Sequence, residues 1–329
     1  MTTAPSPTER PASANVTCAD GVVLPVRLRY PPAGTAPLAV VQFNPGTAVP
    51  IRFYRRFLDY LAAGGFVVAA YDNRGTGASR PAGDLRDCRY RYLDYGTLDA
   101  VAVLDHLREA FAGLPLLIVG HSAGGQQLPL YPAEAYRGVR GALLFAVSTG
   151  YGAGLADYYR PRAWAFWHLI GPALTRVYGY PRLSRLGLME DLPTGVYRDW
   201  RRWCTSPDYF FDARFQRGGA EAHETVNSLG APVPTPVWEA MEFPVRHVHA
   251  PTDEISSLRN VGTFWRHWRP AGGVEQVVLD PADYGGRPIR HFDYFREGFA
   301  GTVWAAAAAW LRARVAHPPG TGAPKSRRV

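Results

Sequence analysis

Short, largely apolar runs alternate with helix-like segments along most of this chain. Six such runs stand out, in order: LAVVQFN, FVVAAYD, LLIVG, VRGALLFAV, FPVRHVHA and VEQVVLD. Continuous apolar runs of this kind are typical of strands that are buried on both faces, as in parallel sheets. Between the runs, apolar residues recur at helical spacing, for example in RFYRRFLDYLAAGG and YGTLDAVAVLDHLREAF. The pattern predicts an α/β fold, with a mostly parallel central sheet and helices on both of its faces.

The alternation stops between residues 148 and 215, which hold 15 of the 42 aromatic residues and show helical pieces but no strand pattern. We therefore expect residues 15–147 and 216–316 to form the α/β core, and residues 148–215 to form an aromatic-rich helical cap inserted into it. At the start of the core, Asp20-Gly21 separates two β-like runs and predicts a hairpin. The Pro-, Gly- and Ser-rich ends, residues 1–14 and 317–329, are expected to be disordered tails.

A serine lies between glycines where the third apolar run ends. The segment GHSAG, residues 120–124, matches G-x-S-x-G and stands between a predicted buried strand and a predicted helix. A sharp strand-to-helix turn leaves no room for side chains two residues away on either side, which explains both glycines. Such a turn exposes the serine hydroxyl at the carboxyl end of the sheet. Ser122 is therefore the candidate nucleophile, presented on a nucleophile elbow.

A serine hydroxyl needs a general base and an orienting acid, which follow the elbow in the order acid, then histidine. His291 is the candidate base, because it lies in the Gly- and Pro-rich stretch YGGRPIRHFDYF between the last strand and the last helix. His247 and His249 lie inside a predicted strand, where at least one should point into the sheet packing.

Asp253 is the candidate acid, because it directly follows the strand FPVRHVHA in a loop that should lie beside the histidine. Asp280, at the end of VEQVVLD, is the competing residue, although it is equally suited to cap the loop that follows. Asp293, two residues after His291, is better suited to cap the last helix.

Two backbone N–H groups are needed to bind the oxyanion that forms during acyl transfer. Ala123, at the helix start, supplies the first. The second should come from NPGTAVP, the loop after the LAVVQFN strand, where Gly46 allows the closest approach and Thr47 is the alternative. An ordinary Pro-Gly turn would also account for this loop. The glycine-rich segment NRGTGASR lacks the context of a phosphate-binding loop, so we interpret it as a structural turn.

Composition excludes several classes of function. Three scattered cysteines give neither a disulfide framework nor a zinc motif, and no metal or cofactor ligand set is visible. The net charge of +8 comes almost entirely from arginine without a dense basic run, apart from the short tail KSRR, which argues against nucleic-acid binding. The N-terminus has no apolar signal segment, and no run is long enough to span a bilayer, so we expect a cytoplasmic protein.

Several motifs together resemble the α/β-hydrolase superfamily, and within it predicted serine hydrolases of the esterase/lipase-like group. They are NPGT (44–47), FYRRF (53–57), YDNRGTGAS (71–79), GHSAGGQ (120–126), TDEI (252–255) and HFDYFR (291–296). The likeness covers roughly residues 16 to 312 and implies an α/β-hydrolase fold, a Ser-Asp-His catalytic triad and no cofactor. Two positions depart from the pattern: Asn44-Pro45 replaces the usual His-Gly of the oxyanion loop, and Arg290 replaces the glycine that commonly precedes the histidine.

These features predict a serine esterase that cleaves an ester or thioester of a moderately apolar small molecule, free or attached to a carrier, through an acyl-enzyme. The aromatic cap suggests an enclosed apolar pocket, which Trp164, Trp167, Trp200 and Trp203 would line unless they simply pack the cap onto the core. The alternative is an enzyme that keeps the triad but does not hydrolyse, such as an acyltransferase, cyclase or lyase of specialised metabolism. A non-catalytic binding protein on the same fold is a further alternative. The oligomeric state is not indicated.

Overall fold

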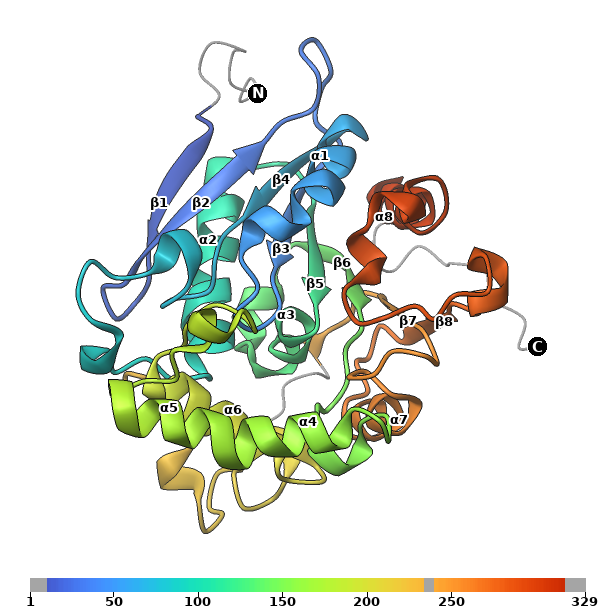
Figure 1. The fold of residues 1–329 in the computed structure, drawn as a ribbon. Coiled ribbons are helices and arrows are strands. Elements are labelled where there is room, and N and C mark those ends of the chain that lie inside the picture. Colours follow the sequence, from blue (N-terminus) through green and yellow to red (C-terminus); the bar gives the residue numbers. More distant parts are fainter. Residues whose placement is uncertain (1–10, 234–239, 317–329) are drawn as a thin grey trace.

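A computed structural model describes residues 11–233 and 240–316 of the chain. Within these ranges, eight strands form one sheet in the order β1-β2-β4-β3-β5-β6-β7-β8 (Figure 1). The strands are β1 (Ser13–Thr17), β2 (Val23–Arg29), β3 (Ala39–Asn44), β4 (Phe66–Ala70), β5 (Leu116–His121), β6 (Val139–Phe145), β7 (Val245–His249) and β8 (Val274–Val278). Of the predicted tails, residues 1–10 and 317–329 lie outside the described residues. The prediction of a tail over residues 1–14 is wrong at Ser13 and Ala14, which pair with β2 as part of β1.

The sheet is parallel from β4 to β8, whereas β1 and β2 are antiparallel to their neighbours. The predicted hairpin at Asp20-Gly21 therefore forms the first strand pair, and Gly21 takes a positive φ of 82° in its turn. All residues of β3, β4 and β5 are buried, because helices cover both faces of the sheet. The predicted α/β architecture is confirmed.

In the part of the chain that the structure describes, eight α-helices surround this sheet or extend from it. They are α1 (Arg55–Ala63), α2 (Val101–Ala110), α3 (Ala123–Gln126), α4 (Arg160–Ala165), α5 (Gly171–Tyr178), α6 (Thr194–Cys204), α7 (Leu258–His267) and α8 (Ala305–Ala316). Apolar side chains of α1 and α8 pack on one face of the sheet, and those of α2 and α7 pack on the other. The sheet is thus the middle layer of three.

Helices α4, α5 and α6 follow β6 and precede β7, and Figure 1 shows them together at one end of the molecule, beyond α3. A π-helical turn, η9 (Phe166–Ile170), joins α4 to α5. The later segment around Asn227 and Ser228 instead packs on the core, because these residues hydrogen-bond Thr97 and Asp94. These helices lie within residues 148–215, the stretch for which the sequence predicts a helical cap, and the bounds of that cap remain a prediction.

Candidate active site

Ser122 occupies a strained position at the junction of β5 and α3. Its φ of 51° and ψ of −117° lie in a region that residues with a side chain rarely adopt. The N–H of Ser122 donates to the carbonyl of Phe145 on β6 at 2.9 Å, and α3 begins at the next residue, Ala123. The strand-turn-helix elbow predicted from GHSAG is therefore present, with Ser122 at its apex and half-buried.

The elbow depends on glycines because other backbone approaches it closely. A Cβ atom at Gly120 would lie 2.8 Å from the backbone nitrogen of Gly125, and one at Gly124 would overlap the carbonyl oxygen of Asn44. Asn44 is itself fixed, since its side chain donates to the carbonyl of Gly124 and to the hydroxyl of Tyr131. The end of β3 and the start of α3 are thus held against each other.

Asp253 and His291, which are 38 residues apart in sequence, meet in a buried pair. Nδ1 of His291 lies 3.1 Å from Oδ1 and 3.1 Å from Oδ2 of Asp253. Oδ1 also accepts the N–H groups of Ile255 at 2.9 Å and Ser256 at 2.7 Å, and Oδ2 accepts the hydroxyl of Tyr294 at 3.1 Å. Burial opposes ionisation of Asp253, but His291 and these N–H donors together hold its pKa below the ordinary value.

The loop that carries His291 lies against the elbow. The ring of His121, the residue before Ser122, lies 4.9 Å from the ring of His291 between centroids. Nε2 of His121 is 3.0 Å from the carbonyl oxygen of His291. The tertiary structure thus brings the elbow, the candidate acid and the candidate base into one place.

The alternative histidines have other contacts. Nε2 of His247 accepts the N–H of Val147 at 3.0 Å, and the ring of His249 stacks on that of His247 at 4.8 Å. Burial is the main cause that lowers the pKa of His247 to about 3, with a smaller contribution from nearby His249. Both histidines are therefore part of the packing around β7, as the sequence predicts for at least one of them.

The alternative acids cap turns. Asp280 accepts the N–H of Ala282 at 2.9 Å, at the start of a 3₁₀ turn. Asp293 accepts the N–H of Arg290 at 2.8 Å and closes the loop that carries the candidate base. These contacts leave Asp253 as the carboxylate that contacts His291.

The loop after β3 differs from expectation at the second oxyanion donor. The N–H of Gly46 donates to the hydroxyl of Tyr54 at 3.1 Å, so it already has an acceptor. Among the described residues, the N–H groups of Thr47 and Ala123 have no acceptor in the chain. Thr47 is fixed by a 2.6 Å contact between its hydroxyl and that of Tyr92, and the next residue, Ala48, takes a positive φ of 55°.

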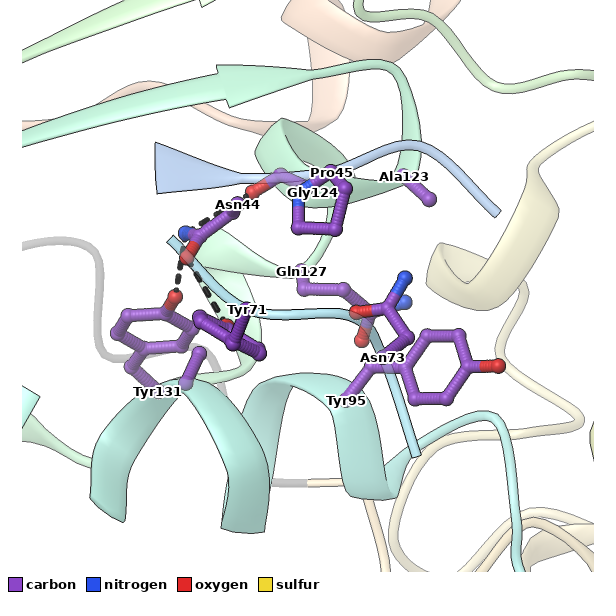
Figure 2. A pocket seen from close by; sticks show the side chains of 10 residues that line it. Asn44, Pro45, Tyr71, Asn73, Tyr95, Ala123, Gly124, Gln127 and Tyr131 are labelled. Carbon is purple, nitrogen blue, oxygen red and sulfur yellow. Dashed lines mark hydrogen bonds between the residues drawn. The ribbon is translucent and has the colours of Figure 1, made fainter. Parts of the chain in front are cut away.

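A small cavity lies between the end of β3 and the start of α3. Figure 2 shows the residues that line it, and its volume is about 10 Å³, room for roughly one water molecule. Both polar atoms of the Gln127 amide are buried there without a partner in the described part of the chain. The cavity is too small for an acyl group, so a substrate pocket has to lie elsewhere around the elbow.

The four cap tryptophans differ in their surroundings. Trp203 is fully buried and packs on Tyr92 and Tyr209, with ring centroids 5.2 and 5.5 Å apart, which matches the packing interpretation. The rings of Trp167 and Trp200 meet edge to face at 4.7 Å. Trp164 is 56% exposed, so it faces solvent.

Arg290, the residue before the candidate base, contacts the cap. Its guanidinium donates to the hydroxyl of Tyr158 and lies over the ring of Tyr158 at 5.3 Å. It also lies 4.0 Å from the carboxylate of Glu254, which adjoins Asp253. Arg290 therefore joins the base loop, the acid loop and the first turn of the cap.

The NRGTGASR segment is a structural turn, as the sequence interpretation expects. Arg74 is fully buried, and its guanidinium contacts the carboxylates of Asp20 at 2.5 Å, Asp94 at 3.0 Å and Asp99 at 2.6 Å. Gly77 lacks a side chain because a Cβ there would overlap the carboxylate of Asp72. Surroundings this acidic would repel a phosphate group.

In the described ranges, no group of three or more His, Cys, Asp or Glu side chains is arranged to hold a metal ion. None of the helices there combines the length and apolar character needed to cross a bilayer.

Two contacts of the site were not predicted from the sequence, although their residues lie in the motifs named above. Tyr294 donates to Asp253, and its place three residues after His291 in HFDY is the only local signal for it. Tyr54 and His121 contact each other across 67 residues of sequence, so no spacing rule could pair them.

The comparisons with known proteins agree with this fold. The family model described as serine aminopeptidase, S33 matches residues 35–194, which include the elbow but neither Asp253 nor His291. No curated protein matches the chain by sequence.

Solved structures share the fold at low identity. A soluble variant of monoglyceride lipase from Saccharomyces cerevisiae is 16% identical, with 94% of this chain and 99% of that chain covered and a TM-score of 0.60. Est1E from Butyrivibrio proteoclasticus is 14% identical, with 93% and 100% covered and a TM-score of 0.55. The esterase domain of a Rhodothermus marinus protein is 19% identical, with 92% and 98% covered and a TM-score of 0.53. The chain therefore shares the α/β-hydrolase fold with these structures.

Proposed function

We propose that this protein is a serine hydrolase that cleaves a carboxylic ester or thioester through an acyl-enzyme. The observation that carries the proposal is the strained elbow at Ser122 beside the buried Asp253–His291 pair. The positive φ of Ser122 costs free energy. Such strain is found where the surrounding structure holds a reactive group in place. A strained serine next to a buried carboxylate-histidine pair supports a catalytic role for this place.

In the proposed reaction, the hydroxyl of Ser122 attacks the substrate carbonyl while Nε2 of His291 takes its proton. A carboxylate only accepts hydrogen bonds, so Asp253 holds the proton of neutral His291 on Nδ1 and leaves the Nε2 lone pair free. Asp253 then stabilises the imidazolium. His291 returns the proton to the leaving group, and water hydrolyses the acyl-enzyme by the same steps.

We assign the oxyanion to the N–H groups of Ala123 and Thr47. Both are free of acceptors within the described chain, whereas the N–H of Gly46 is bound to Tyr54. The N-terminus of α3 adds a favourable partial positive charge. The proposal thus keeps Ala123 and replaces Gly46 by Thr47, which the sequence analysis named as the alternative.

For the substrate we propose a small, mostly apolar ester. The monoglyceride lipase and the esterases that share the fold support an ester, rather than another acyl compound, as the substrate. The S33 description names an aminopeptidase, and the same triad chemistry would cleave an amide. The tests therefore include both bonds.

The first test compares the wild type with Ser122→Ala on p-nitrophenyl esters of graded acyl length and on aminoacyl p-nitroanilides. Wild-type turnover of esters, lost in Ser122→Ala with unchanged unfolding, is the expected result. Ser184→Ala in the cap is the matched control and should keep full activity. Undiminished ester turnover by Ser122→Ala would refute the mechanism. If the wild type cleaves the anilides in preference to the esters, the proposed activity changes from esterase to peptidase.

A fluorophosphonate probe supplies an independent test, because only an activated serine reacts with it. Mass spectrometry of a digest should find the adduct on the peptide that carries Ser122. An absence of labelling would instead favour the alternative of a non-catalytic binding protein with this fold. A burst of p-nitrophenol followed by slow turnover that an added alcohol or amine accelerates would favour the acyltransferase alternative.

A further inference from the structure

Two buried side chains that the proposed reaction does not use lie between the oxyanion loop and His291. Tyr54 ends a 3₁₀ turn, η2 (Ile51–Tyr54), that leads into α1, and His121 is the last residue of β5. Both are fully buried. They form a continuous chain of hydrogen bonds from the N–H of Gly46 to the carbonyl of His291.

Each bond in this chain has only one possible direction when His121 is neutral. The carbonyl oxygen of His291 can only accept, so Nε2 of His121, 3.0 Å away, carries the proton. Nδ1 of His121 then accepts from the hydroxyl of Tyr54 at 2.8 Å. The oxygen of Tyr54 in turn accepts the N–H of Gly46 at 3.1 Å. Each N–H, O–H and ring nitrogen of this hydrogen-bond chain therefore has a partner.

The surroundings favour this neutral arrangement. Burial, and the nearby His291, keep the pKa of His121 well below its ordinary value. The ring of Phe295 packs edge to face on both side chains, at 4.8 Å from Tyr54 and 4.9 Å from His121. Water is thereby excluded, and a lost hydrogen bond at either residue would leave a buried polar atom without a partner.

We propose that Tyr54 and His121 are positioning residues that hold the backbone of His291 and the oxyanion loop in register on either side of Ser122. This inference rests on the proposed serine-hydrolase function. Asp253 fixes the imidazole of His291 through its side chain, whereas His121 fixes the backbone of the same residue. We call the hydrogen-bond chain from Gly46 through Tyr54 and His121 to His291 the relay. It also holds the N–H of Gly46 on Tyr54 and away from the substrate, which leaves Thr47 as the second oxyanion donor.

The test uses Tyr54→Phe, which removes one oxygen and leaves the ring packing intact. Two polar atoms, the N–H of Gly46 and Nδ1 of His121, lose their partner. We expect kcat on a p-nitrophenyl ester to fall about 10- to 100-fold with KM unchanged, because misplacement of the reacting groups affects the chemical step. The rate of fluorophosphonate labelling should fall by the same factor.

Tyr136→Phe is the matched control, because it also removes a single buried hydroxyl, which donates to the carbonyl of Leu128 at 2.8 Å. It should keep the wild-type kcat. His121→Gln should lower kcat as Tyr54→Phe does, and the double variant should be no slower than His121→Gln, because both changes break one relay. A folded Tyr54→Phe variant with wild-type kcat, or strictly additive losses, would overturn the inference.

A spectroscopic measurement reads the protonation of His121 directly and does not depend on the activity of any variant. Nitrogen-15 NMR of histidine-labelled protein at pH 7.5 should show His121 with a proton on Nε2 and none on Nδ1, the signals being assigned by their loss in His121→Gln. The opposite tautomer would refute the relay. Failure of the relay is distinguishable from failure of the proposed function, because Ser122→Ala and probe labelling decide the latter in the wild-type background.

Discussion

Nδ1 of His291 lies at the same distance, 3.1 Å, from both carboxylate oxygens of Asp253. Asp253 is 1% exposed and His291 is 3% exposed, so the pair is largely screened from water. The carboxylate is further tied to the backbone of the turn that follows β7. The pair is thus a fixed unit whose orientation the fold determines.

Asp253→Asn tests the role of the charge with little change in shape. The amide oxygen can still accept the N–H groups of Ile255 and Ser256, which both bind the same atom, Oδ1, in the wild type. The new amide nitrogen donates to Nδ1 of His291 and moves the imidazole proton to Nε2. We expect kcat to fall about 10⁴-fold, as for other triads with the wrong tautomer, with the fold intact by circular dichroism. A loss below tenfold would exclude Asp253 as the acid.

Gly124→Ala and Gly262→Ala should have opposite effects on stability. A Cβ at Gly124 overlaps the carbonyl oxygen of Asn44, so the elbow has to distort and activity should be lost. A Cβ at Gly262, inside α7, meets nothing within 4 Å. Alanine there should raise the free energy of unfolding by roughly 0.5–1 kcal/mol, because glycine weakens a helix interior. Urea unfolding measures both, and a fully active Gly124→Ala would contradict the packing of the elbow.

Arg74→Met should destabilise the protein strongly. The guanidinium is fully buried among Asp20, Asp94 and Asp99, and its loss leaves carboxylates without a counter-charge. We expect a loss of about 3–5 kcal/mol in the free energy of unfolding. The comparison is Arg246→Met, at a partly exposed pair with Glu275, which should cost only about 0–1 kcal/mol. Equal losses of the free energy of unfolding in the two variants would show that the contacts of Arg74 with the three aspartates do not stabilise the protein more than an exposed ion pair does.

Stability should decrease in mild acid, partly through His247. Burial lowers its pKa to about 3, whereas an unfolded histidine has a pKa of about 6.5. Between these values the unfolded chain binds one more proton at this residue, so the free energy of unfolding falls by up to about 1.4 kcal/mol per pH unit as pH decreases. His247→Gln should reduce this slope, measured by urea unfolding from pH 4 to 6. His223→Gln, at an exposed position, is the matched control variant.

Secondary structure was predictable where a single spacing of apolar residues dominates a segment. The apolar runs at 38–44, 66–72 and 116–120 became β3, β4 and β5, because burial on both faces demands apolar residues throughout. The segment FREGFAGTVWAAAAAWLRARV, residues 295–315, predicts one closing helix. The structure differs at its start: two short 3₁₀ turns precede a π-helical turn at Ala300–Trp304, and α8 begins only at Ala305. Residue periodicity does not distinguish an α-turn from a π-turn, since both hide the same apolar residues.

The second oxyanion donor shows what a local pattern misses. Gly46 is attractive in sequence because it lacks a side chain, but the hydroxyl of Tyr54 reaches its N–H from the start of α1. That contact depends on where α1 packs against the loop. The proposal therefore moves to Thr47 for a tertiary reason.

Local sequence patterns specify the layered α/β architecture and the elbow at Ser122, because periodicity and the steric demand for glycine act over a few neighbouring residues. Tertiary structure decided that Asp253 meets His291 and that His121 reaches the backbone of the same histidine, because parallel strands bring distant loops to one edge of the sheet. Hydrogen bonds need partners within about 3 Å, and only the assembled fold sets such distances between residues far apart in the chain.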